Sequence, residues 1–160
     1  MGPFQLVSKQ ADAHITWDRI VGSGAANSIS RGEPTKQGSA GAVAIMADGE
    51  GTTSELFTGI AKSESTDTAA AAGRVLTYIP FPGIIYSGKP KVSGACNTQA
   101  EIDALVGSRV VFDLTSTTWT VDTAAADAIG NAVVMVGGQP EEDRIWFVVT
   151  HTSLNFFENN

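Results

Sequence analysis

Short apolar runs separated by turn residues make up most of the chain after Gly41. The runs are of about strand length and are rich in Val, Ile, Thr and aromatic residues, as is typical of β-strands. The predicted strands are Ala42–Met46, Glu55–Lys62, Gly73–Pro80, Gly83–Gly88, Arg109–Leu114, Thr118–Asp122, Asn131–Val136 and Arg144–Thr152. The pattern predicts a mainly β protein whose body is a small β-barrel or a β-sandwich-like fold.

Two of these runs are predicted to pair with each other. Apolar and polar residues alternate through residues 109–122 on both sides of the short polar stretch Thr115-Ser116-Thr117. Alternating runs joined by so few residues are typical of a β-hairpin.

One short capped helix is predicted over residues 98–106. Thr98 and Glu101 have the T-x-x-E spacing of a capping box, and Gly107 can adopt the left-handed conformation that ends a helix. The apolar face of this helix would consist of Ile102, Leu105 and Val106.

The first 41 residues have a different composition, with few apolar side chains and many Gly, Ser, Ala and Asn. Such a segment cannot cover much core by itself. Its two apolar runs, Phe4–Ser8 and His14–Val21, could each add a strand to a neighbour's sheet. We therefore interpret residues 1–41 as an extended N-terminal arm and residues 42–160 as the β-rich domain. The alternative is that the arm contains ordinary edge strands that fold onto their own domain.

Composition and charge restrict the class of protein. The 160 residues suffice for one domain with a sizeable core, and the single cysteine, Cys96, excludes an intrachain disulfide and is expected to be buried. Only 17% of the residues are charged, so the surface must be rich in small polar residues, which suits a protein covered by partners. The net charge of −7 argues against a nucleic-acid partner, and no apolar run is long enough to span a membrane.

The stretch GIIYSGKP, residues 83–90, comes within one residue of the phosphate-binding pattern G-x-x-x-x-G-K-[ST]. Pro90 stands where that pattern requires a hydroxyl for Mg²⁺, and proline has no N–H to donate to a phosphate. We therefore interpret the stretch as a strand that ends in a Ser-Gly turn.

Other candidates for catalysis or metal binding form no recognisable set. His14 and His151 have no second ligand at helical spacing, and Ser23 lacks the G-x-S-x-G context of a nucleophile. The acidic stretches Asp48–Gly51 and Glu141–Asp143 are interpreted as turns. We expect no catalytic residue, cofactor or metal and therefore no enzyme, while an enzyme of an unrecognised family stays an alternative.

Taken in order, four segments of the body resemble the small capsid decoration, or cement, proteins of tailed bacteriophages. The segments are LFTGIAKSESTDTAAAAGRVLTYIPFPGIIYSG, GSRVVFDLTSTTWTVD, AIGNAVV and RIWFVV, within residues 42–149. The resemblance implies a β-barrel-like body that associates as a homotrimer on the outer surface of the virion. It also implies that the protein stabilises the capsid by bridging subunits of the major capsid protein.

Residues for such contacts can be suggested. The expected capsid or subunit contacts are Phe4, Leu6, Ile15, Trp17, Arg19, Ile20 and Arg31 in the arm, together with Lys89 and Lys91, which would pair with a neighbour's carboxylates. An alternative function is a virion-associated carbohydrate- or receptor-binding module. In that case exposed Tyr86, Trp119 and Trp146 would stack on sugars.

Overall fold

A computed structural model of the chain describes residues 4–6, 16–21, 28–38, 41–50, 57–68, 70–81, 83–127, 131 and 133–150. Among these residues the strands are β1 (Gln5–Leu6), β2 (Thr16–Val21), β3 (Pro34–Gln37), β4 (Val43–Ile45), β5 (Phe57–Ala61), β6 (Gly73–Tyr78), β7 (Tyr86–Gly88), β8 (Arg109–Thr115), β9 (Thr118–Asp122), β10 (Val133–Gln139) and β11 (Arg144–Val149). The helix α1 spans Gln99–Leu105, and a short 3₁₀-helix spans Pro140–Glu142.

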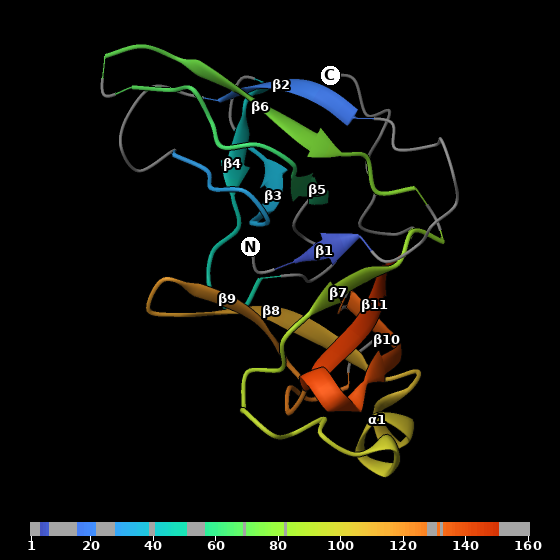
Figure 1. Ribbon diagram of the computed structural model, residues 1–160. Helices are drawn as coiled ribbons and strands as arrows, with labels where there is room; N and C mark the ends of the chain where they lie inside the picture. Colours follow the sequence, from blue (N-terminus) through green and yellow to red (C-terminus); the bar gives the residue numbers. More distant parts are fainter. Residues whose placement is uncertain are drawn as a thin grey trace.

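The strands form two β bodies. β2, β4, β3, β5 and β6 form a closed barrel, and a six-stranded sheet has the order β1-β7-β11-β10-β8-β9. Figure 1 shows the barrel above, the sheet below, β1 between them, and α1 at the end of the molecule far from the barrel. The prediction of a mainly β fold with a small barrel and one short helix is confirmed.

The six-stranded sheet curls until its β7 side meets β9. After β7 the chain continues along β9, where the N–H of Lys91 donates to the carbonyl of Val121 at 2.8 Å and the N–H of Val121 donates to that of Lys89 at 3.0 Å. Pro90 forms a parallel bridge to Val121. The sheet is therefore a curled half-barrel, and the residues after β7 join its two sides.

The hairpin predicted over residues 109–122 is confirmed. Thr115 pairs with Thr118, and the pairing continues to Val111 and Asp122. Ser116 makes the turn with φ 58°, a left-handed conformation that its short side chain permits.

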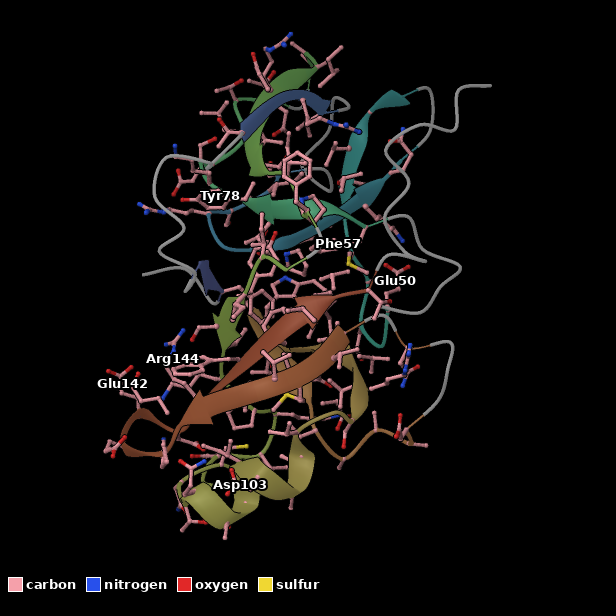
Figure 2. The ribbon with its side chains drawn as sticks, turned by 90° about the vertical axis from the view of Figure 1, so that its right-hand side faces the viewer. Glu50, Phe57, Tyr78, Asp103, Glu142 and Arg144 are labelled. Carbon is pink, nitrogen blue, oxygen red and sulfur yellow. The ribbon has the colours of Figure 1, made fainter. Side chains whose placement is uncertain are left out.

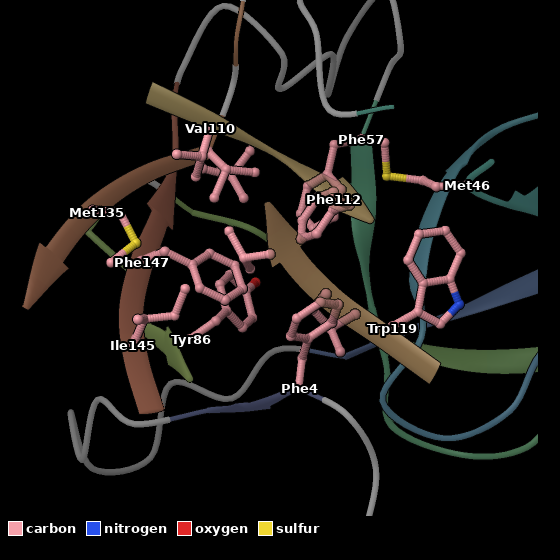
Figure 3. Close-up of a cluster of buried hydrophobic side chains, with 14 of the residues drawn as sticks. Phe4, Met46, Phe57, Tyr86, Val110, Phe112, Trp119, Met135, Ile145 and Phe147 are labelled. Atoms are coloured by element: carbon pink, nitrogen blue, oxygen red, sulfur yellow. The ribbon is translucent and has the colours of Figure 1, made fainter. Parts of the chain in front are cut away.

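A single hydrophobic core joins the two bodies. It contains Met46 and Phe57 from the barrel side together with Tyr86, Phe112 and Phe147 from the sheet, as Figure 3 shows. The rings of Phe57 and Phe112 are stacked, with their centroids 5.8 Å apart. A smaller cluster of short side chains fills the barrel, consisting of Val21, Ile29, Val43, Ala61 and Val75. The larger core thus crosses from one body to the other, while the smaller cluster fills only the interior of the barrel.

The described parts of residues 1–41 belong to the fold of their own chain. β2 pairs with β6 along six residues, from Thr16 opposite Tyr78 to Val21 opposite Gly73, and β3 pairs with both β4 and β5. Without β2 and β3 the barrel could not close. β2 and β3 therefore fold onto their own chain, as the alternative to an extended arm held. Gly41 does not separate a free arm from the body.

The helix prediction is confirmed at its start. The Thr98 hydroxyl accepts a hydrogen bond from the N–H of Glu101, whose carboxylate in turn accepts from the N–H of Thr98, so both halves of the capping box form. Ile102 is fully buried against β10, but Val106, expected on the buried face, is 51% exposed. The helix ends at Leu105, so Val106 no longer follows the helical face.

Candidate interaction surface

The outer face of β2 and β6 exposes large aliphatic side chains. Along β6, Val75 and Thr77 are buried while Arg74 and Leu76 are exposed. Ile20 lies opposite Arg74, and Asp18 lies opposite Leu76, so these four side chains project from the same side of the strand pair. Ile20 is 54% exposed and Leu76 is 37% exposed. They are diagonal neighbours on the barrel surface.

Charged groups surround these aliphatic side chains. Nε of Arg74 lies 2.7 Å from Oδ2 of Asp18, and this hydrogen bond raises the pKa of Arg74. Nζ of Lys62 lies 5.8 Å from the centre of the Tyr78 ring, within the range of a cation–π contact. We call this surface the β2–β6 face; it consists of Asp18, Ile20, Lys62, Arg74, Leu76 and Tyr78. An apolar centre within a polar rim is the general arrangement of a protein–protein interface.

Arg19, which was expected to contact a partner, is turned toward the barrel instead. It lies opposite buried Val75, and its Nη2 donates to Oε1 of Gln37 on β3 at 2.9 Å. Burial lowers the pKa of its guanidinium. The alternation of β2, which places Ile20 outside, necessarily places its neighbour Arg19 on the other side.

The other expected arm contacts have different outcomes. Phe4 is only 3% exposed and belongs to the core, so it is a core residue of its own chain. Arg31 is exposed in a turn. Leu6 lies in β1 and Trp17 lies in β2, but their side chains, like all of Ile15, are outside the described residues.

Lys91 pairs with carboxylates of its own chain rather than a neighbour's. Its Nζ lies 2.7 Å from Oδ1 of Asp113 and 3.0 Å from Oδ2 of Asp122, and the side-chain hydrogen bonds with these two groups raise the pKa of Lys91. Burial by itself raises the pKa of Asp113, but hydrogen bonds from Lys91 and Thr115 outweigh it, so the pKa is lowered. These partners are far apart in sequence and meet only because residues 89–91 run along β9.

Lys89 is also engaged within the chain. Its Nζ donates to the backbone carbonyl of Glu142 at 2.9 Å, which ties the residue after β7 to the β10–β11 connection. Figure 2 shows Glu142 and Arg144 at that end of the hairpin. In this arrangement Lys89 serves to hold two segments of its own sheet.

The sugar-stacking alternative loses two of its three aromatic residues. Tyr86 and Trp119 are each only 1% exposed, and both belong to the hydrophobic core. Trp146 is half-buried, with its ring lying close to Gly137. Neither Tyr86 nor Trp119 can present a ring face to a sugar in this structure.

The near match to a phosphate-binding loop is part of the sheet. Tyr86, Ser87 and Gly88 form β7 and are all buried, so the Ser-Gly pair lies within the strand and not in the predicted turn. Pro90 is buried against β9. The glycines and the lysine of the motif therefore do not surround a common point at a helix start.

The remaining residues considered for catalysis or metal binding either have structural roles or lie outside the described residues. The Asp143 carboxylate accepts from the N–H groups of Gly94 at 2.7 Å and Cys96 at 3.0 Å, while Glu141 and Glu142 are exposed as expected of a turn. Cys96 is buried as predicted, and burial raises its pKa to about 11. His14, Ser23 and His151 are outside the described residues. Within the described ranges, no three His, Cys, Asp or Glu side chains are grouped so that they could hold a metal ion.

No helix in the described part of the chain has the length and apolar character needed to cross a membrane. Comparison with protein-family models, with curated proteins and with solved structures finds no match to this chain in any of the three.

Proposed function

We propose that this protein is a structural component of a phage virion that decorates the outside of the capsid and stabilises it as a homotrimer. In this proposal it bridges subunits of the major capsid protein and carries no catalytic residue. The observation that supports it best is the β2–β6 face, where Ile20 and Leu76 are exposed beside an ion pair on a closed barrel. The order of the strand segments, which resembles that of capsid decoration proteins, supports the same function.

The β2–β6 face has properties that suit a contact with a large, regular surface. The barrel beneath it is closed, so the backbone that carries these side chains needs no further ordering on binding, and ordering costs affinity. Among its side chains two are cationic and one is anionic, although the whole chain carries −7. A local excess of positive charge on an acidic protein favours one orientation toward an acidic partner.

Sedimentation of capsids with the purified protein tests this proposal. Heads of the phage that encodes the chain, prepared without it, should bind the wild-type protein and melt at a higher temperature. A double variant, Ile20→Ser with Leu76→Ser, should bind at least about 30-fold more weakly, because each aliphatic side chain that becomes buried on binding contributes about 1.5–3 kcal/mol relative to leaving it exposed. Circular dichroism should show that the double variant is folded.

A matched control replaces another exposed aliphatic residue. Val92 is more exposed than Leu76 but lies in the segment before α1, outside the β2–β6 face, so Val92→Ser should bind heads like the wild type. Failure of the wild-type protein to bind any form of the head would disprove the capsid role. Equal binding by wild type and the double variant would disprove only the choice of face.

A further inference from the structure

β1 is a strand that the sheet can lose without losing any other pairing. It has two residues, pairs with β7 alone among the strands that the structure describes, and lies at the edge of the sheet, with Gln5 opposite Ser87 and Leu6 opposite Tyr86. β7 is paired on its other side with β11. Removing β1 would therefore leave a free β7 edge, and free edges accept extended strands.

The residue before β1 fills a socket in the core. Phe4 contacts Phe112 and Phe147, with ring centroids 5.3 Å and 5.4 Å apart. Gly88 on β7 makes room for the ring, because a Cβ at that position would lie 2.6 Å from two of the Phe4 ring carbons. Figure 3 shows Phe4 among these aromatic side chains. The site thus combines a strand edge, which β1 pairs with, and a socket that holds one aromatic ring.

The backbone of the segment that fills this site is also bonded outside β7. The N–H of Phe4 donates to the carbonyl of Gly32 at 3.3 Å. Nine residues separate Leu6 from Thr16, where β2 begins. A connection of that length can span at most about 30 Å.

We propose that the β7 edge and the Phe4 socket are an acceptor site for residues 4–6 of a second copy of this chain, so that neighbouring copies exchange β1. Every copy carries the same segment and the same socket, so exchange reproduces each contact and changes only the connection between strands. A high local concentration of copies then favours the exchanged form by mass action. The exchange does not depend on the capsid role.

Disulfide trapping between single-cysteine variants tests the exchange. The variants Gln5→Cys and Ser87→Cys are made on a Cys96→Ala background, mixed at high concentration and oxidised. Because residues 5 and 87 are direct partners, a disulfide that joins the two variants requires β1 of one copy to pair with β7 of another. We expect this heterodimer, identified by mass spectrometry of the linked peptides, and we expect its yield to rise with concentration.

Two controls make the result specific. A mixture of Val134→Cys and Val148→Cys, which are partners on the central strands β10 and β11, should give no heterodimer. Adding Gly88→Ala to the Ser87→Cys chain, or Phe4→Ala to the Gln5→Cys chain, should reduce the heterodimer at least about tenfold, as loss of a buried aromatic contact predicts.

The double variant Gln5→Cys with Ser87→Cys supplies the deciding comparison. If it closes within one chain while the mixed single variants give no heterodimer, β1 stays with its own chain and the exchange is disproved. If neither disulfide forms, β1 does not pair with β7 at all, and the acceptor site is equally disproved. Neither result would bear on binding to capsids.

Discussion

At the scale of single residues, Lys91 determines the charge state of a nearly buried carboxylate. Asp113 is 5% exposed, and its burial alone would favour the neutral acid. The ammonium of Lys91, at 2.7 Å, and the hydroxyl groups of Thr115 and Thr120 stabilise the anion instead. Because the folded state lowers the pKa of Asp113, the folded state binds this proton less readily than the unfolded chain does.

This linkage predicts the dependence of stability on pH. The contribution of Asp113 to stability is complete above its unfolded pKa of about 4 and is lost as the pH falls through its lower folded value. In Lys91→Met the free energy of unfolding should fall less between about pH 5 and pH 2 than in the wild type. Urea unfolding at a series of pH values measures this.

The matched control is Lys89→Met, because Lys89 donates to a backbone carbonyl that does not titrate. Its unfolding free energy should depend on pH as in the wild type. Identical acid dependence in Lys91→Met and the wild type would contradict the assigned role of Lys91.

Phe4 gives a second prediction at this scale. Since its ring is buried among Phe112 and Phe147, Phe4→Ala should reduce the free energy of unfolding by about 3–5 kcal/mol, the usual cost of removing a buried phenylalanine. Phe81, which is exposed, is the control, and Phe81→Ala should cost much less. Urea unfolding of a dilute sample measures both, and equal small losses would mean that Phe4 is not a core residue.

At the scale of elements, β2 and β3 give the barrel its closure through backbone pairing. β2 places Val21 inside and joins β6 through six paired residues, while β3 contributes the buried hydroxyl of Thr35, which donates to the carbonyl of Gly59 at 2.8 Å. Backbone pairing and small interior residues therefore determine this part of the fold. Loss of β2 would leave the interior of the barrel open along β6.

Deleting residues 1–21 tests the place of β2. The shortened chain should lose the protection of amide hydrogens against exchange in β4, β5 and β6, because local stability follows paired and buried backbone. Protection in β10 and β11, which pair within the other sheet, should fall much less. Unchanged protection in β6 would contradict a barrel closed by β2.

The elements that the sequence predicts well are those specified by local pattern. Alternating apolar residues and a polar turn are enough to predict the β8–β9 hairpin, and the capping box is enough to predict where α1 begins. The barrel strand β2 was interpreted as part of an arm because residues 1–41 as a whole contain few apolar side chains. Its partner, β6, lies more than fifty residues away, so no local pattern reveals the pairing. The alternation of apolar and polar residues in a strand does not show whether the strand pairs with its own chain or with a neighbouring molecule.

The candidate surface was predictable only in part for a similar reason. Ile20 was identified as a contact residue and is exposed, but Leu76 joins it only through the register of β2 on β6. Lys91 was expected to meet a neighbour because basic residues are few in an acidic body. The carboxylates that it meets, Asp113 and Asp122, are distant from it in sequence, and only the curl of the sheet brings them to it. Pairings of this kind depend on tertiary structure.

At the scale of the whole molecule, one shared core holds a barrel against a curled sheet. The β2–β6 face lies on the barrel, and α1 lies at the opposite end of the molecule, as Figure 1 shows. A bound copy that turns the barrel toward a capsid would thus direct α1 and the acidic connection at Glu141 and Glu142 outward. The proposed function therefore specifies an orientation as well as a partner.

Cryo-electron microscopy of heads reconstituted with the purified protein measures this orientation directly. We predict density for three copies grouped on the outer surface of the head, with the β2–β6 face against the major capsid protein and α1 pointing away from it. Heads without added density, or copies bound with the β2–β6 face exposed to solvent, would contradict the account.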